Sequence, residues 1–596
     1  MEHYLEIWKL MSINIIGSGL AGLSAAITLA KQNIACNLIS ALPSERAQSV
    51  LAEGGINGAL NTMGEDDCPA DHMADTLKAG AYIADPEAVK GLTDNAPEIL
   101  RWLMDLGVPF NMECGRVIQR NFGGQKKKRT AFAKSSTGKI LMSVLTDETR
   151  KYEAAGLIKR YDHHEFEMPE FTGAEGSRVC RGAWVRDDYS NEMLFFEGPV
   201  IMCTGGMNGF FPGMTTGTVP NTGDASAMLF SQGVVFSNLE MIQFHPTTYG
   251  IAGKRCLVSE AARGEGGRLF VMKGGKPWFF MEEKYPELGN LMPRDVVARE
   301  MYFVMHDEAL KVLADGAAGA GGAKQGKIGN DAGSYAGAGG ARQGKSRKNA
   351  DPYAGCRPGQ VYLEMRHLPS KTWEEKLPDL REELIRYLNV DPKKAPVPVE
   401  PGIHYFMGGI DVDIDHRTNI AGLYAAGECC SQYHGANRLG GNSTMGAIYG
   451  GRVAAETAAE EAEKNPAMAG VRKTAQPQAA ACRKGPASAL IPAGPEFIEE
   501  LSNILLDAMG IVRNQVKLQG ALEKIENIKN KRGLSVREMN RLCIAEAMLL
   551  CADRRKESRG AHYREDFPQT EDAYKGKITA VYDAESGQVR TGFKAV

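Results

Sequence analysis

The chain has 596 residues, with 70 Lys and Arg against 73 Asp and Glu and a formal net charge of −3. A chain of this length predicts several domains, because single hydrophobic cores stop growing near ~250–300 residues. The apolar fraction of 43% and the charged fraction of 24% are typical of globular proteins. The near balance of charge argues against nucleic acid or an anionic membrane surface as the main partner.

The cysteines exclude several kinds of site. Twelve cysteines are scattered along the chain without a C-x-x-C pair. This spacing predicts no metal site, since zinc, iron–sulfur and haem motifs use close pairs. It also favours a reducing, cytoplasmic setting. No apolar run reaches the ~18 residues of a membrane helix, so we expect no membrane span.

Residues 13–40 read as a strand, a glycine turn, a helix and a second strand. The turn carries Gly17-x-Gly19-x-x-Gly22, and in this context the glycines allow a pyrophosphate to approach the helix N-terminus. A ribose-binding acid is expected at the end of the second strand, but Ser40 stands there. The pattern therefore predicts a dinucleotide site and favours a flavin over a nicotinamide.

Later segments continue the alternation of strands and helices. Short buried strands are predicted within 199–206 and 422–428, and a helix is predicted over 444–464. Two stretches with helical spacing, 495–531 and 535–558, follow an Ala/Pro-rich linker. The Gly/Ala/Lys-rich tract 314–355 has too few apolar residues to hold one conformation, so we predict a flexible insertion.

Several arginines and histidines lie among glycine, proline and small residues, as in loops that contact a ligand. A lone histidine in such a place is more often structural than functional. Together they indicate a small anionic substrate, most simply a carboxylate, because Arg offers a fixed pair of donors. The residues are His245, Arg263, Arg294, His404, His434 and Arg438.

The order of these motifs resembles the flavoprotein subunits of the fumarate reductase/succinate dehydrogenase family, to which L-aspartate oxidase is related. The resemblance covers nearly the whole chain outside the insertion and the linker. The matching segments are 17–22, 51–55 (LAEGG), 120–138, 244–247 (FHPT), 260–267 (EAARGEGG), 293–299, 404–409, 422–428, 434–443 (HGANRLGGNS) and 557–568 (ESRGAHYREDFP).

The resemblance implies an α/β fold with a Rossmann-like FAD-binding domain, an inserted α+β capping domain and a C-terminal helical domain. The expected parts are the first part of the FAD-binding domain at 1–243, the capping domain at 244–400 with its insertion at 314–355, the second part at 401–460, a linker at 461–495 and the helical domain and tail at 496–596.

The resemblance also implies roles for individual residues. FAD would be held by Gly17, Ser18, Gly19, Gly22, Ser40, Ser49, Gly54, Gly55, Asp224, Glu428, Ser443 and Thr444. The two carboxylates of a C4 dicarboxylate, fumarate or succinate, would be bound by His245, Ser259, His404 and Arg438. Arg294 would donate or accept the proton, with Glu260 and Arg263 as a relay behind it.

The spacing of Glu260 and Arg263 places both on one face of a helical turn. An arginine with a pKa above ~12 is an unusual acid, so it needs a carboxylate nearby to return its proton. A purely structural ion-pair network of Glu260, Arg263 and Arg294 stays open as an alternative.

Gln48 stands where covalently flavinylated relatives have histidine, so the resemblance implies noncovalent FAD. A covalent bond raises the flavin potential, and its absence favours fumarate reduction over succinate oxidation. An iron–sulfur electron-transfer subunit is the implied partner, and it would place this cytoplasmic chain peripherally at the cytoplasmic face of a membrane. L-aspartate oxidase remains the alternative function, and a flavin-binding subunit without turnover is a further one.

Overall fold

The computed structural model describes residues 12–134, 136–174, 176–251, 253–312, 353, 355–464, 481–482 and 491–596. It forms two compact units. Unit 1 comprises Met1–Phe211, Gly217–Gln243 and His404–Val596, and unit 2 comprises Pro212–Thr216 and Phe244–Ile403. The flexible insertion predicted at 314–355 lies almost entirely outside the described residues, as does most of the predicted linker.

A five-stranded parallel sheet lies in the core of unit 1, in the order β21-β12-β1-β2-β8. Its strands are β1 (Ile13–Ile16), β2 (Cys36–Ser40), β8 (Ile158–Asp162), β12 (Val200–Met202) and β21 (Leu423–Ala425). β1 is fully buried, and its one polar residue, Asn14, donates its amide to the carbonyls of Phe196 and Glu197. The buried strands predicted around 13–16, 199–206 and 422–428 are present.

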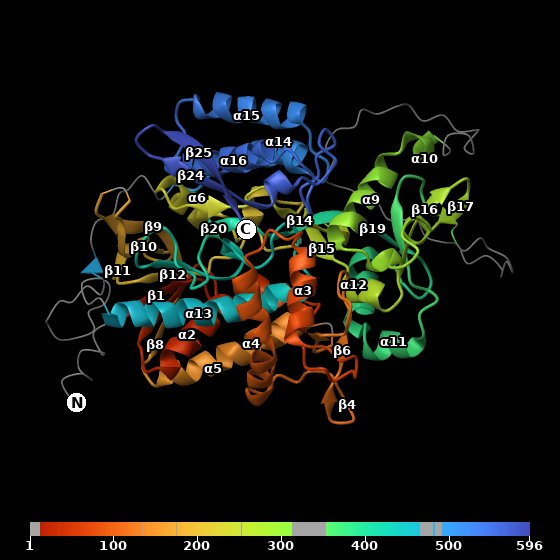
Figure 1. The fold of residues 1–596 in the computed structure, drawn as a ribbon, viewed down its shortest axis with the longest axis horizontal. Coiled ribbons are helices and arrows are strands. Elements are labelled where there is room, and N and C mark those ends of the chain that lie inside the picture. Colours follow the sequence, from red (N-terminus) through yellow and green to blue (C-terminus); the bar gives the residue numbers. More distant parts are fainter. Residues whose placement is uncertain are drawn as a thin grey trace. The chain divides into compact units, whose positions relative to one another are not determined.

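Helices pack around this sheet (Figure 1). α2 (Leu20–Lys31) contacts both α13 (Asn442–Lys464) and α5 (Thr137–Ala154), and α3 (Pro69–Ala79) packs on α4 (Pro86–Asp105). α2 is rich in alanine and buried at nearly every position, which lets its neighbours approach closely. Asp85 caps α4 through the backbone N–H groups of Glu87 and Ala88.

The rest of unit 1 contains smaller sheets. An antiparallel sheet has the order β23-β11-β10-β9, with β9 (His164–Thr172), β10 (Val179–Asp187), β11 (Met193–Glu197) and β23 (Ala481–Cys482). Short strands form the order β3-β7-β6, with β3 (Ile56–Asn57), β6 (Gln119–Arg120) and β7 (Thr130–Ala131), and a separate pair of β4 (Met112–Glu113) and β5 (Arg116–Val117).

The C-terminal segment completes another sheet of unit 1, in the order β22-β20-β13-β24-β25. Its strands are β13 (Phe236–Ser237), β20 (Gly409–Asp411), β22 (Cys430–Ser431), β24 (Gly576–Asp583) and β25 (Gln588–Ala595). α16 (Val536–Arg554) packs on β24 and β25 and against α6 (Asp224–Ser231), α14 (Pro495–Met509) and α15 (Gln515–Lys529); most of this segment is blue in Figure 1.

The C-terminal segment differs from the sequence prediction in two details. The helical stretch expected over 495–531 is two helices, because α14 ends at Met509 and Gly510 adopts an extended backbone. Asn514 then caps α15 through the backbone N–H of Lys517. The hairpin of β24 and β25 is an addition to the helical domain that the sequence predicted, while the overall α/β fold class is confirmed.

Unit 2 is built on a six-stranded sheet in the order β15-β14-β19-β18-β16-β17. Its strands are β14 (Ile242–Ile251), β15 (Lys254–Leu257), β16 (Arg268–Lys273), β17 (Lys276–Trp278), β18 (Val361–Glu364) and β19 (Val397–Phe406). Its helices are α7 (Ala261–Gly264), α8 (Phe280–Lys284), α9 (Arg294–His306), α10 (Glu308–Val312), α11 (Ser370–Glu375) and α12 (Pro378–Leu388). The sheet places the residues before α7 and the first turn of α9 in one unit.

Candidate functional site

The glycine turn between β1 and α2 has the shape that a pyrophosphate needs. Gly17 has a φ of +111°, a conformation that favours glycine, and a methyl group there would lie 2.2 Å from the carbonyl oxygen of Cys203. A methyl group on Gly22 would lie 1.8 Å from the Gly17 carbonyl oxygen. Gly19 forms the N-cap of α2, so the first turn of the helix directs its N–H groups toward the turn. These features fit the phosphates of FAD.

The serines of the predicted flavin site hold the loops around this turn. Ser49 Oγ accepts a hydrogen bond from Leu20 N at 3.3 Å, which joins the segment after β2 to the start of α2. Ser40 Oγ donates to the Leu42 carbonyl at 2.6 Å, and Ser18 Oγ lies 3.4 Å from the same oxygen. The hydroxyl groups thus shape the end of β2, where the sequence has no acidic residue.

Small residues bring the 44–55 segment close to its neighbours. Gly55 has a φ of +135°, and a methyl group there would lie 2.5 Å from the Ala131 carbonyl oxygen. Thr444 Oγ1 donates to the Gly55 carbonyl at 3.1 Å, so the start of α13 lies beside this segment. Ser443 precedes Thr444 in the same helix. Gly54 packs against the ring of Phe122, which would lie only 3.0 Å from a methyl group at this position.

The two predicted acidic ligands of FAD have different surroundings. Glu428 is in the short 3-10 helix η5 (Gly427–Cys429) after β21, and burial raises its pKa to about 7. Its Oε2 accepts a hydrogen bond from Gln48 Nε2 at 3.1 Å. Asp224 begins α6 and forms ion pairs with Arg537 at 3.2 Å and Arg541 at 2.6 Å, both from α16. Glu428 therefore contacts Gln48, in a segment that is predicted to bind the flavin, whereas Asp224 is engaged with the C-terminal helix.

A buried polar network supports the N-terminus of α13. Asn442 Oδ1 lies 2.9 Å from His72 Nε2 and 2.7 Å from Asn57 Nδ2. Gln125 Nε2 donates both to Asn57 Oδ1 at 3.0 Å and to the Gly440 carbonyl at 3.0 Å. Burial lowers the pKa of His72 to about 3, so this imidazole is neutral. The network fixes the GGNST turn, whose last two residues were predicted to contact the flavin.

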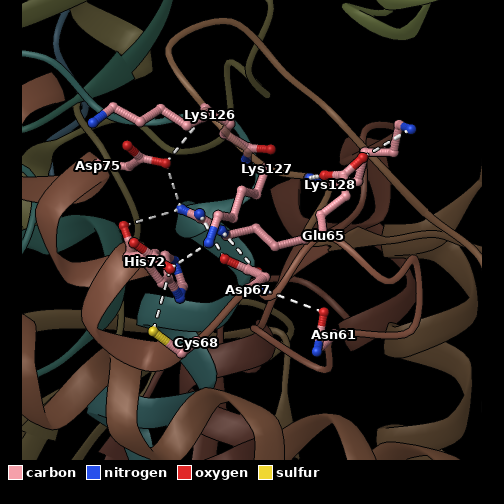
Figure 2. A network of polar contacts seen from close by, with 12 residues as sticks. Asn61, Glu65, Asp67, Cys68, His72, Asp75, Lys126, Lys127 and Lys128 are labelled. Carbon is pink, nitrogen blue, oxygen red and sulfur yellow. Dashed lines mark hydrogen bonds and ion pairs between the residues drawn. The ribbon is translucent and has the colours of Figure 1, made fainter.

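Beside this network, the buried Arg129 joins two buried aspartates, Asp67 and Asp75, both labelled in Figure 2. Arg129 lies 2.9 Å from Asp67 and 2.8 Å from Asp75, and none of the three side chains is more than 2% exposed. Asp75 also accepts the backbone N–H of Lys126 at 3.0 Å. Further out, Lys127 pairs with Asp71 at 2.7 Å. These contacts anchor residues 122–130 (FGGQKKKRT), which are part of the 120–138 segment that carries the family resemblance.

Unit 2 brings the predicted proton donor, Arg294, together with the two predicted relay residues, Glu260 and Arg263. Glu260 Oε2 accepts hydrogen bonds from Arg294 Nε at 3.0 Å and Nη2 at 2.5 Å. Its Oε1 accepts from Arg263 Nη2 at 3.0 Å, and Arg263 Nη1 donates to the Asn290 carbonyl at 2.6 Å. All three side chains are buried, and burial lowers the pKa of Arg263, an effect that Glu260 opposes. One carboxylate is thus shared by two guanidinium groups.

The predicted substrate ligands of unit 2, His245 and Ser259, both precede this cluster in the sequence. Arg294 is the first residue of α9, directly after Pro293. Ser259 is buried and immediately precedes Glu260. His245 is buried on β14, and its Nδ1 lies 3.2 Å from the carbonyl oxygen of Thr247.

Unit 1 carries the other two predicted substrate ligands. Arg438 is buried, and its guanidinium lies 4.5 Å from the ring centre of Tyr405. Gln243 Nε2 donates to the Arg438 carbonyl at 2.8 Å. His404 is half-buried near the end of β19. Burial and the Arg438 charge lower the pKa of His434 to about 3, so this histidine contributes no positive charge near neutral pH.

Among the residues that the structure describes, no group of three or more His, Cys, Asp and Glu side chains is arranged to hold a metal ion. No helix of the part of the chain that the structure describes is both long and apolar enough to cross a membrane.

The chain matches two protein-family models, an FAD binding domain over residues 13–444 and a fumarate reductase flavoprotein C-terminal domain over residues 530–596. The succinate dehydrogenase flavoprotein subunit of Bacillus subtilis is 36% identical, over 94% of this chain and 92% of its own length. The fumarate reductase flavoprotein subunit of Mycobacterium tuberculosis is 32% identical, over 98% and 97%. A solved mutant E. coli quinol fumarate reductase is 27% identical, with a TM-score of 0.76 over 98% of this chain and 96% of that one.

Proposed function

Because the chain belongs to the succinate dehydrogenase/fumarate reductase flavoprotein family and is an FAD-dependent oxidoreductase, we propose that it interconverts fumarate and succinate, in the fumarate-reducing direction. The observation that carries this proposal is the Glu260 carboxylate shared by Arg294 and Arg263. The chain also has the predicted substrate ligands His245, His404 and Arg438, which a flavin-binding subunit without turnover would not need.

In the proposed reaction, one alkene carbon of fumarate receives a hydride and the other receives a proton. FAD, when bound and reduced, would supply the hydride. Arg294 donates the proton, while Arg438, His404, His245 and Ser259 hold the carboxylates and stabilise the charge that develops as the hydride arrives.

The Glu260 contact explains how an arginine could serve as an acid. Loss of a proton from Arg294 leaves a neutral guanidine whose Nε and Nη2 still face Glu260 Oε2. Glu260 would take up a proton from water and pass it to Arg294 across this contact, and Arg263 would stabilise the carboxylate that results. In the oxidative direction the same groups would accept the proton. The cluster therefore supports proton delivery in steps between neighbouring atoms.

We propose that the Rossmann-like turn and Glu428 hold FAD without a covalent bond. Gln48 has an amide where a linking residue would need a nucleophilic ring nitrogen. The turn at Gly17–Gly22 provides the pyrophosphate site, and the Glu428 carboxylate is an acceptor for an FAD hydroxyl. Ser443 and Thr444 at the start of α13 would contact the isoalloxazine.

We also propose an electron-transfer partner with iron–sulfur clusters, at the cytoplasmic face of a membrane. The relatives are named as flavoprotein subunits, which supports a role for this chain in a larger complex. Such a partner would return electrons to FAD between turnovers.

A dye assay tests the function. Purified chain loaded with FAD is supplied with a reduced viologen dye and either fumarate or L-aspartate under exclusion of air, and peroxide is measured with aspartate in air. Fumarate-dependent dye oxidation is the expected result. Aspartate-dependent peroxide without a fumarate reaction would instead identify an L-aspartate oxidase, and FAD binding with neither reaction would refute catalysis by the isolated chain.

A further inference from the structure

The side chain of Gln48 uses both ends of its amide. Gln48 begins the 3-10 helix η2 (Gln48–Leu51), and its Oε1 accepts hydrogen bonds from Asn208 Nδ2 at 2.7 Å and Asn221 Nδ2 at 3.0 Å. The backbone N–H of Thr218 points to the same oxygen at 3.4 Å. Nε2 donates to Glu428 Oε2 at 3.1 Å. Three separated parts of unit 1 therefore meet at one side chain.

The chemistry of the partners fixes which end of the amide faces which group. An ionised carboxylate can only accept, so the atom facing Glu428 must be the NH₂ group. A backbone N–H can only donate, so the atom facing Thr218 must be the oxygen. Asn208 and Asn221 add two further donors to this oxygen and hold the amide in place.

Glu428 is a carboxylate whose charge depends on its neighbours. Burial raises its pKa to about 7, while the backbone N–H groups of Phe406 and Gly206 and the charge of Arg438 oppose this rise. The phenol of Tyr405 also interacts with Glu428, and burial raises the pKa of that phenol, so it stays neutral. A single additional donor to Glu428 is therefore enough to change its ionisation near neutral pH.

Resting on the proposed role of Glu428 in binding an FAD hydroxyl, we propose that Gln48 is a positioning residue for the flavin. Its Nε2–H group orients the Glu428 carboxylate and favours its ionised form, while its Oε1 is anchored by Asn208 and Asn221. Glutamine at this position thus acts through a carboxylate that binds the cofactor noncovalently.

With Glu428 as an FAD ligand, FAD affinity should decrease as the pH falls. The ionised Glu428 carboxylate is the better acceptor for a hydroxyl, so affinity is high above the pKa of Glu428 and falls as the pH decreases through it. Removal of the Gln48 donor disfavours the ionised form and raises that pKa. The midpoint of the affinity change therefore moves to higher pH.

The test measures the FAD affinity of the full chain by fluorescence titration after its flavin has been removed. The titrations cover about pH 5.5 to 8.5, a range centred on the pKa of a group that titrates near pH 7. Gln48→Leu removes the amide with little change in size, and Gln48→Asn withdraws it by one methylene. Each variant should move the midpoint of the FAD affinity change up by about one pH unit. At pH values below the midpoint, this shift lowers the ionised fraction of Glu428 about tenfold. Gln32→Leu, an exposed glutamine after α2, is the matched control and should leave the midpoint unchanged.

A double-mutant cycle separates action through Glu428 from a general structural effect. In the Glu428→Gln background, FAD affinity should lose its pH dependence, and Gln48→Leu should then move no midpoint. An unchanged midpoint in both Gln48 variants, or an equal shift with and without Glu428, would overturn the proposal. Failure of the wild-type chain to bind FAD at any pH would instead refute the proposed function.

Discussion

Replacement of Arg294 by lysine addresses the proposed proton donor directly. Arg294 contacts Glu260 through two nitrogens, at 3.0 Å and 2.5 Å, at the start of α9. Lysine keeps the positive charge but offers one compact ammonium group in place of the planar fork. It can hold Glu260 or reach the former position of the guanidinium, but it cannot reproduce both contacts at once.

The expected fall in turnover follows from the loss of a positioned acid. A positioned acid contributes typically 10²–10⁴-fold to the rate. We expect Arg294→Lys to lower turnover by about 10³-fold, which corresponds to about 4 kcal/mol of activation free energy. FAD binding should stay within about threefold of the wild type, a factor worth well under 1 kcal/mol, because the predicted flavin contacts belong to unit 1.

Fumarate-dependent oxidation of reduced viologen measures turnover, and flavin fluorescence measures FAD binding in the same preparation. The matched control is Arg386→Lys on the exposed side of α12, also in unit 2, which should retain wild-type turnover. An Arg294→Lys variant that keeps its turnover while FAD is bound would refute the assignment of Arg294 as the acid.

Three further predictions concern the flavin site and its support. Gly22→Ala places a methyl group 1.8 Å from the Gly17 carbonyl oxygen. We expect FAD affinity, measured by titration, to fall at least about tenfold, which matches an overpacking cost of about 1–3 kcal/mol. In the control Gly520→Ala in α15, the added methyl group meets no atom within 4 Å, so this variant should bind FAD normally. Arg129→Met leaves two buried aspartates without their arginine and should lower the free energy of unfolding by about 3–5 kcal/mol, measured as a lower urea midpoint. The exposed control Arg101→Met should keep the wild-type midpoint. Equal midpoints for the two variants would contradict the burial argument. Acid precipitation of the wild-type chain should release all of its FAD into the supernatant, and flavin retained in the pellet would disprove noncovalent binding.

The sequence predicted the elements whose signals are local. β1, α2 and β2 follow from apolar runs separated by the glycine turn, and these patterns specify a structure without knowledge of the rest of the chain. The grouping of Glu260 with Arg263 is local as well, since the two side chains are three residues apart. The contact of both with Arg294 was expected only from the family resemblance.

The contacts that sequence reasoning missed join distant segments. Neither Gln48 nor Glu428 has a neighbour in sequence that signals their hydrogen bond, because 380 residues separate them. Arg129 follows three lysines in the sequence, yet it is fully buried between Asp75 of α3 and Asp67 of the preceding loop. Local patterns describe which residues favour burial, but they do not identify the partner that makes burial of a charge tolerable.

The pairing of β13 with β24 has a consequence for how the protein is made. β13 lies in the middle of the chain, but its antiparallel partner is the second-last strand of the C-terminal segment. During synthesis from the N-terminus, this sheet stays incomplete until nearly the whole chain has left the ribosome, and such distant pairings form slowly. Truncation of the C-terminal hairpin would leave β13 with an open edge, so a shortened chain should aggregate rather than accumulate as a folded flavoprotein.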